Sequence, residues 1–246
     1  MLIPFLTHAW ASSPERLEVA AAVTLGFAVL ARALRGVKLS GALAGGLACF
    51  LLFAAAGPAA FAALAALFAM TWASTRLGYR RKLALGLAER REGRNGWQIL
   101  ANLSVAAMAS VVFSATGSRV WLVATLSALA EAATDTVASE IGQYRGGDPR
   151  LITTWKRAAA GTDGGITMAG SIAGMAAGLA IAAVGTVGGM LPQAQFWIPV
   201  SAGFAGMLID SLLGATLQRR GWISNQAVNF FSTIAAAAIA YCISTW

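Results

Sequence analysis

Charged side chains are scarce in this chain. They make up 11% of its 246 residues, whereas hydrophobic residues make up 58%. An ordinary soluble domain carries roughly 25% charged and about 45–50% apolar residues. So few charges cannot cover the surface of a water-soluble protein of this length. The composition therefore excludes a soluble enzyme and a disordered chain, and it indicates a protein that crosses a membrane several times.

Histidine and cysteine are nearly absent as well. His8 is the only histidine, and Cys49 and Cys242 are the only cysteines. A single histidine excludes histidine-based metal sites and a Ser-His-Asp triad. Two cysteines within apolar segments do not form a disulfide scaffold. Any chemistry must therefore use carboxylates, basic side chains and backbone groups.

Long apolar runs are what the sequence does contain. A helix needs about 20 such residues to cross a bilayer. By that measure we predict an all-α bundle of about eight transmembrane helices, forming one membrane domain over residues 1–246, in which residues 1–18 could lie in the membrane interface. The predicted spans lie near residues 19–34, 39–57, 58–75, 98–116, 120–141, 165–189, 197–217 and 226–245.

Basic residues predict the orientation of these spans. Sixteen of the eighteen fall on alternate connections, and Arg16 and Arg119 are the exceptions. Because cytoplasmic loops are enriched in Lys and Arg, we expect the loops 76–97 and 142–164 in the cytoplasm and both termini outside. The net charge of +8 is then a topology signal and not a nucleic-acid footprint. We expect a multi-pass protein of a bacterial-type inner membrane, with its polar site on the cytoplasmic side.

Four acids fall inside the predicted spans: Glu131, Asp135, Glu140 and Asp210. Glu131 and Asp135 lie about 40° apart on one helical face, which Ser139 continues. A carboxylate at membrane depth is costly unless a cation, a partner or water compensates it. Mg²⁺ fits, because it takes carboxylates together with substrate phosphates. The alternative is that these acids are neutral and hydrogen-bonded between helices.

A second Asp motif resembles the first. Asp210-Ser211 is followed by Gln218, as Asp135-Thr136 is followed by Gln143. If both helices run in the same direction, the two aspartates lie at matched depth and could share one metal ion. The repeat is short, so chance similarity is the alternative.

The loop before the sixth span is rich in groups that bind anions. It contains Lys156 and Arg157, followed by Gly161-Thr162-Asp163-Gly164-Gly165. Thr162 or Asp163 could cap the next helix, and the glycines would let backbone N–H groups face a phosphate. The alternative is a plain capped helix start without a ligand. Gly170, Gly174 and Gly178 recur every four residues and predict a close-packing seam.

Six short motifs together resemble one membrane family. They are Arg76-Leu-Gly78, Gly93-Arg94 with Leu100-Ala-Asn102, Asp135-Thr-x-Ala-Ser-Glu140-Ile-Gly142, Gly161-Thr-Asp-Gly-Gly165, Asp210-Ser-x-x-Gly214-Ala-x-x-Gln218 and Asn225-x-x-Val-Asn229. In this order they resemble the family that contains transmembrane protein nineteen and the plant phytyl-phosphate kinase. The chain departs from that pattern at Leu103, where Gly is expected, and at Thr167, where Ser is usual.

A wider group shares part of this pattern. Polyprenol kinases and phosphatidate cytidylyltransferases similarly carry an Asp-x-x-Ala-x-x-x-Gly helix, then a Lys, then a Gly-Thr-x-Gly segment. The resemblance implies a Mg²⁺-bound nucleoside triphosphate, with CTP favoured, that donates a phosphoryl group to an isoprenyl monophosphate such as phytyl or geranylgeranyl phosphate. Phosphoryl transfer depends on positioning and charge neutralisation, so the scarcity of histidine and cysteine is no obstacle.

On this hypothesis each candidate residue has a role. We expect Asp135, Asp210 and Lys156 to be catalytic, and Asp135 and Asp210 to hold the metal with help from Glu131 and Glu140. Phosphate groups would be held by Arg157, Gly161, Thr162, Asp163, Gly164, Gly165, Arg76, Arg80 and Arg94. The pocket would be shaped by Asn102, Ser139, Gln143, Gln218, Asn225 and Asn229. The partners would be isoprenyl phosphate and membrane lipid, without nucleic acid, and glycine-rich helix faces could support a homo-oligomer.

Three other functions remain open from the sequence. An ion-coupled transporter of a small molecule or lipid would also use intramembrane carboxylates. Its polar groups should extend toward the outer leaflet, where this chain has almost none. A non-catalytic membrane partner would explain the glycines but not the acids. A nucleotidyltransferase that makes a CDP-lipid would use the same residues as the kinase.

Overall fold

The computed structural model describes residues 14–89, 91–145 and 147–245. His8 and most of the expected interfacial segment 1–18 lie outside this part of the chain. Of that segment, residues 16–18 already belong to the first described helix.

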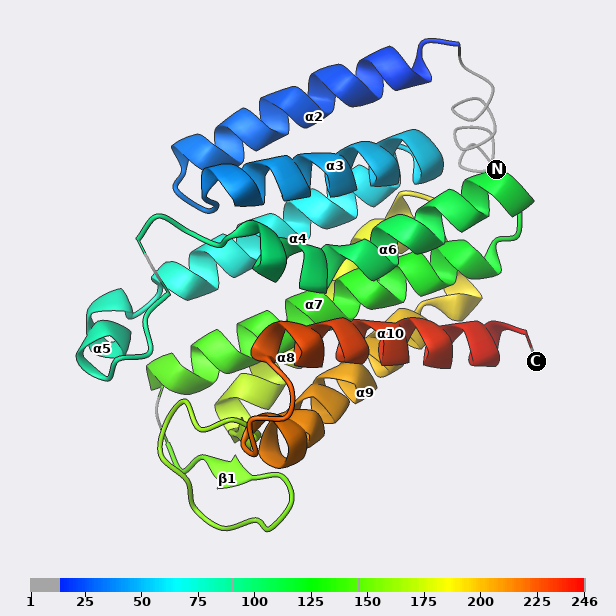
Figure 1. The fold of residues 1–246 in the computed structure, drawn as a ribbon. Coiled ribbons are helices and arrows are strands. Elements are labelled where there is room, and N and C mark those ends of the chain that lie inside the picture. Colours follow the sequence, from blue (N-terminus) through cyan, green and yellow to red (C-terminus); the bar gives the residue numbers. More distant parts are fainter. Residues whose placement is uncertain (1–13, 90, 146, 246) are drawn as a thin grey trace.

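The chain folds into a bundle of long helices, as predicted (Figure 1). The helices are α2 (Arg16–Ala33), α3 (Leu39–Ala56), α4 (Pro58–Arg76), α6 (Gly96–Thr116), α7 (Val120–Arg145), α8 (Met168–Val187), α9 (Trp197–Leu213) and α10 (Asn225–Ser244). Within the described residues, seven segments are long and apolar enough to cross a membrane, and α2 is not among them. Although α2 has 18 residues, its three charged residues, Arg16, Glu18 and Arg32, make it too polar to count as a candidate span.

Local sequence signals set the helix boundaries. Gly57 adopts a φ of 83° between α3 and α4, and Pro58 occupies the first position of α4, where its missing N–H costs no hydrogen bond. Asn95 and Gln98 form a reciprocal capping box at the start of α6. These signals divide the long apolar run 39–75 into two helices and fix the entry to α6.

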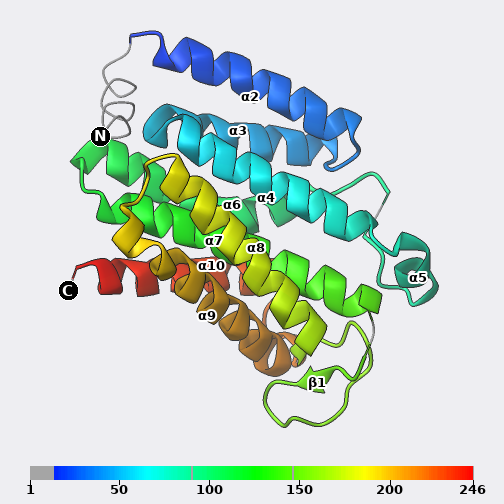
Figure 2. The same cartoon turned by 180° about the vertical axis from the view of Figure 1, so that it is seen from behind.

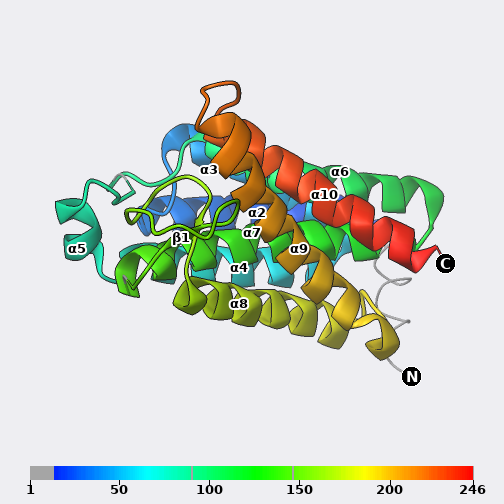
Figure 3. The ribbon, with the colours of Figure 1, turned by 90° about the horizontal axis from the view of Figure 1, so that it is seen from below.

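The helix α7 lies at the centre of the bundle and packs against α4, α6, α8, α9 and α10 (Figure 3). Among the seven candidate spans its apolar window is by far the most buried. The helix α2 packs on α3 at the edge of the bundle (Figures 1 and 2). The acids of α7 are therefore held in the protein interior and not in lipid.

The basic connections gather at one end of the bundle. The short helix α5 (Tyr79–Ala84) and the hairpin of β1 (Arg150–Leu151) and β2 (Gly165–Ile166) lie there, at the end of the bundle opposite the last turn of α10 (Figures 1 and 2). The two strands are antiparallel and pair Arg150 with Ile166 and Leu151 with Gly165. We call this the basic end; it also contains the candidate site described below.

The expected glycine seam is confirmed between α7 and α8. A Cβ added to Gly174 would lie 2.6 Å from the carbonyl oxygen of Thr134, and one added to Gly170 would lie 2.5 Å from that of Ala138. No side chain fits at such distances, so these positions let the two helix backbones approach closely.

The start of α8 differs from the prediction. Neither Thr162 nor Asp163 caps it: the helix begins at Met168, and Thr167 accepts a hydrogen bond from the Gly170 N–H at 3.0 Å. Gly164 has a φ of 75°, and the next two residues pair with β1. The left-handed turn and the strand pairing compete with helix formation and delay it to residue 168.

Candidate active site

A polar cavity of about 280 Å³ opens at the basic end, among α6, α7, α9, α10 and the loop before β2. Most of the predicted site residues line it. Ten of them belong to the helices, to their ends or to the segment before α6: Arg94, Asn102, Asp135, Ser139, Glu140, Gln143, Asp210, Gln218, Asn225 and Asn229. Five belong to the segment that leads into β2: Gly161, Thr162, Asp163, Gly164 and Gly165. The fold thus brings together residues separated by more than a hundred positions in the sequence.

Asp135 of α7 and Asp210 of α9 both face this cavity. Their carboxyl groups are near enough to repel each other electrostatically. Ser232 donates a hydrogen bond to Asp210 Oδ2 at 3.3 Å. Arg94 is attracted to Asp135, and its Nη1 lies 3.5 Å from the hydroxyl of Thr136. Two acids that face one cavity need a positive ligand to be ionised together.

Glu131 lies one turn deeper on α7 and does not line the cavity. Its side chain is 1% exposed, and neither carboxylate oxygen has a hydrogen-bond partner of normal geometry within the described residues. It interacts electrostatically with both Asp135 and Asp210. Glu131 therefore adds to the acidity behind the site without touching a ligand in it.

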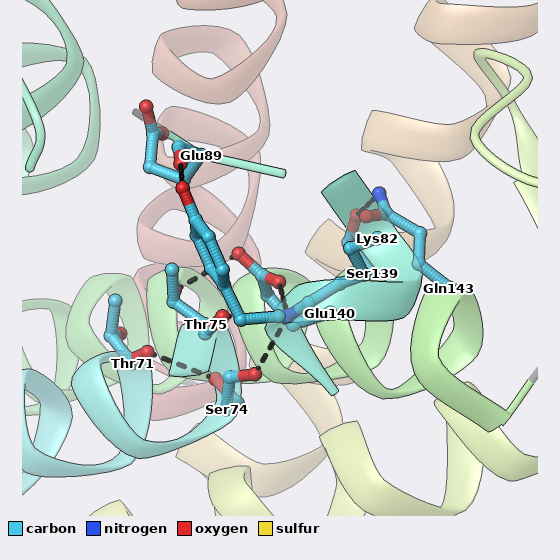
Figure 4. Close-up of polar contacts among 9 residues, drawn as sticks. Thr71, Ser74, Thr75, Lys82, Glu89, Ser139, Glu140 and Gln143 are labelled. Carbon is cyan, nitrogen blue, oxygen red and sulfur yellow. Dashed lines mark hydrogen bonds and ion pairs between the residues drawn. The ribbon is translucent and has the colours of Figure 1, made fainter. Parts of the chain in front are cut away.

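Glu140 is engaged by protein groups. Its Oε2 accepts from Lys82 Nζ at 2.5 Å, and its Oε1 accepts from Thr75 at 2.9 Å (Figure 4). Lys82 is fully buried and also donates to the carbonyl oxygens of Ser74 and Thr75. Each Glu140 oxygen thus already accepts one hydrogen bond from the protein, so Glu140 is less available to a metal ion than Asp135 and Asp210. Its role at the metal stays a prediction. Sequence reasoning missed this pair because Lys82 is one of seven basic residues in the loop 76–97, and nothing in the sequence distinguishes it from the other six.

Residues 161–165, which we call the roof, line one side of the cavity and pack on two other segments of the chain. A Cβ added to Gly161 would meet Leu87 at 2.2 Å, and one added to Gly164 would meet the backbone nitrogen of Ala215 at 2.5 Å. Ala215 belongs to a turn of π-helix, Gly214–Gln218, that ends α9. Such turns are rare and frequently occur at functional sites. The roof and the end of the Asp210 helix therefore form one packed unit.

Asp163 extends the acidic character of the site to the loop. Partial burial raises the pKa of its carboxyl group, and the nearby Arg219 opposes that rise. Asp163 also repels Asp210 electrostatically. This acid is close enough to the two aspartates to affect any charged ligand that they hold.

Four predicted site residues with basic side chains do not line the cavity. Lys156 and Arg157 are exposed on the hairpin, and Arg157 pairs with Asp148 at 3.0 Å. Arg80 is exposed on α5. Arg76 stacks on Trp72, with 4.1 Å from its guanidinium carbon to the ring centroid, and lines a second cavity instead. Arg94 is the only one of the predicted arginines that lines the polar cavity within the described residues.

The amides form a connected network beside the acids. Asn229 donates to Asn102 Oδ1 at 3.4 Å, and Asn102 donates to the Gln98 carbonyl oxygen at 2.8 Å. Gln98 in turn donates to Glu89 at 3.0 Å. The network ties the start of α10 to the start of α6 and fixes one wall of the cavity.

The donor set favours one class of metal. In the part of the chain described, no group of three His, Cys, Asp or Glu side chains could hold a metal ion. A zinc or calcium site built from protein ligands alone does not fit. Mg²⁺ usually takes only one or two carboxylates and completes its shell with phosphate oxygens and water. Asp135 and Asp210 fit that pattern.

Comparison with known proteins identifies the family. Residues 22–237 match the family described as integral membrane protein DUF92. The chain belongs to this family. The match confirms the resemblance indicated by the sequence motifs, and DUF92 membership makes the chain an integral membrane protein.

Proteins similar to this chain occur in Synechocystis and in Arabidopsis thaliana. An uncharacterized membrane protein of Synechocystis is 33% identical over 196 residues, which cover 77% of this chain and 76% of the relative. The chloroplastic Protein VTE6 of Arabidopsis thaliana is 30% identical over 83% of this chain and 64% of its own length. Protein PGR, also of Arabidopsis thaliana, is 41% identical over 37% of this chain and 35% of its own. No solved structure matches the chain.

The packing of the roof gives a first prediction. In Gly164→Ala the new methyl group would collide with Ala215 and also force a non-glycine residue to a φ of 75°. We expect the hairpin to detach from α9, which would speed trypsin cleavage at Arg150, Lys156 and Arg157. Gly86→Ala is the matched control, because Gly86 has a φ of 70° but nothing within 4 Å of an added Cβ. Equal cleavage rates in the two variants would show that the contact with Ala215 does not hold the hairpin.

Proposed function

We propose that this protein transfers a phosphoryl group, in a Mg²⁺-dependent reaction, from a nucleoside triphosphate to an isoprenyl monophosphate, and that CTP is the favoured donor. The observation that carries the proposal is the meeting of Asp135 and Asp210 in one polar cavity, under a glycine-rich loop and beside Arg94. The resemblance to the family of the plant phytyl-phosphate kinase supports the choice of acceptor. We place the site on the cytoplasmic side, where basic connections are expected.

The reaction needs little from the protein beyond positioning. An oxygen of the acceptor phosphate forms a bond to the γ-phosphorus as the bond between that phosphorus and the β–γ bridging oxygen breaks. The products are the lipid diphosphate and the nucleoside diphosphate. A phosphate acceptor is already ionised at neutral pH, so no general base is required. This agrees with a cavity whose lining, within the described residues, contains no histidine or cysteine.

The chain's own groups would hold the reactants in place. Asp135 and Asp210 would hold Mg²⁺, which when bound neutralises charge on the donor phosphates. The backbone of residues 161–165 would lie along the triphosphate. Arg94 would stabilise the charge that develops on the transferred group. The amides of Asn102 and Asn229 would orient the phosphate oxygens beside the acids.

A double-label assay tests the proposal. Purified protein with Mg²⁺ and geranylgeranyl phosphate receives CTP labelled either at the γ- or at the α-phosphate. We expect the γ label, and not the α label, in the lipid diphosphate. Incorporation of the α label with release of pyrophosphate would instead identify a nucleotidyltransferase. If neither label enters lipid with CTP or ATP, and with phytyl, geranylgeranyl or undecaprenyl phosphate, the enzyme proposal fails and transport becomes the leading hypothesis.

A further inference from the structure

A second cavity of about 340 Å³ lies beside the polar one, among α2, α3, α4 and α6. Its chemistry changes from one end to the other. Toward the membrane interior the lining is apolar, with Phe27, Leu64, Leu67 and Phe68. At the basic end it contains four arginines: Arg35, Arg76, Arg91 and Arg94. Leu64 lies twelve residues from the end of α4, which places the apolar end roughly 18 Å along the helix.

Four arginines meet in this cavity with little acid beside them. Within the described residues none of the four forms an ion pair, since the three ion pairs there use Lys38, Lys82 and Arg157. Arg94 is attracted to Asp135, which lines the polar cavity. Arg35 and Arg76 are near enough to repel each other. The one acid in the lining, Glu89, accepts from Gln98; it and Thr75 appear in Figure 4. Like charges gathered in this way favour an anionic ligand.

The two cavities meet. Glu89, Arg94 and Asn102 line both of them. An anion bound by the arginines of the second cavity would thus lie next to the polar cavity that Asp135 lines. This adjacency is what a transfer reaction between two bound phosphates requires.

We propose that the second cavity binds the acceptor, a single-chain lipid monophosphate, with its phosphate on Arg35, Arg76 and Arg94 and its chain along Phe27 and Phe68. The inference rests on the proposed function. A volume near the lower end of the range for ligand pockets, about 300–1,000 Å³, suits a phosphate and the first part of one chain. A two-chain phospholipid can carry the same phosphate group, but its second chain makes it too bulky for this cavity.

A glycine of α3 and a glycine of α2 make the apolar part of this cavity testable. A Cβ added to Gly45 would approach only Ile99, at 3.7 Å, which is ordinary contact. In Gly45→Leu the side chain therefore enters the cavity without disturbing the backbone, and leucine favours the helix more than glycine does. Gly26→Leu is the matched control: Gly26 is exposed on α2 outside the lining, with nothing within 4 Å of an added Cβ.

The experiment measures equilibrium binding of geranylgeranyl monophosphate to detergent-solubilised full-length protein, without nucleotide, next to CTP binding with Mg²⁺. We expect Gly45→Leu and Arg76→Gln each to weaken lipid phosphate binding at least tenfold, with CTP binding unchanged, and Gly26→Leu to resemble wild type. Geranylgeraniol, inorganic phosphate and dioleoyl phosphatidic acid should compete poorly.

The outcomes separate this inference from the proposed function. If wild type phosphorylates the lipid but Gly45→Leu binds it normally, the acceptor site lies elsewhere and only the inference fails. If phosphatidic acid competes as well as the prenyl phosphate, the cavity is a phospholipid site and the inference also fails. If the variants lose lipid phosphate binding but no transfer occurs in wild type, the binding site stands and the kinase proposal fails.

Discussion

Asp135→Asn is expected to lower lipid diphosphate formation by about 10³-fold or more, the scale of removing a group that neutralises charge in a phosphoryl-transfer transition state. Asparagine keeps the size of the side chain but loses the negative charge that Mg²⁺ requires. Because Asp135 and Asp210 repel each other in the cavity, losing one charge should not destabilise the fold. The measurement is turnover in the γ-label assay, with thermal unfolding recorded on the same preparation.

The control for this variant is Asp148→Asn. Asp148 is an exposed acid on the hairpin side of the basic end, paired with Arg157 and outside the cavity lining. We expect it to keep wild-type turnover. Raising the Mg²⁺ concentration should partly restore Asp135→Asn if the residue holds metal. Turnover of Asp135→Asn equal to wild type would refute the metal assignment.

The bundle itself could be predicted from composition and hydropathy because spans in a bilayer must satisfy their backbone hydrogen bonds internally. The run from residue 39 to 75 shows this well, since Gly57-Pro58 gives both the break and the start of α4. The convergence of Asp135 and Asp210 also followed from helical geometry, because equal spacing to a helix end implies equal depth. The conformation of the chain at the end of a helix could not be predicted in the same way. The π-turn at Gly214–Gln218 has no recognised sequence signal.

The loops show why the remaining residues could not be placed. The sequence predicts Lys156 and Arg157 in the active site, but a β-bridge between Arg150 and Arg157 and the strand pairing around it direct both side chains outward. Lys82 has the same composition signal as its solvated neighbours, and only tertiary packing against Glu140 distinguishes it. The second cavity depends on how α2 packs on α3, and the weak amphipathic pattern of these two helices does not predict their packing partners.

Lys82→Met is expected to destabilise the folded protein by about 3–5 kcal/mol, the cost of leaving one partner of a buried ion pair alone. Lys82 is fully buried, and the side chain of Glu140 is 12% exposed. Removing the ammonium group leaves Glu140 with Thr75 as its one remaining donor among the described residues, and it also frees the carbonyl oxygens of Ser74 and Thr75 at the end of α4. The measurement is reversible denaturant unfolding in mixed micelles.

A double-mutant cycle separates the ion pair from the side chain's bulk. Adding Glu140→Met to Lys82→Met removes both charges at similar volume, and such replacements of buried pairs are often close to neutral. We therefore expect the double variant to regain most of the stability lost in the single one. Arg157→Gln, which breaks the exposed pair with Asp148, should cost less than about 1 kcal/mol. If the double variant were as unstable as Lys82→Met, the loss would come from the carbonyl contacts at the end of α4, and the carboxylate of Glu140 could again be considered as a ligand of the polar cavity.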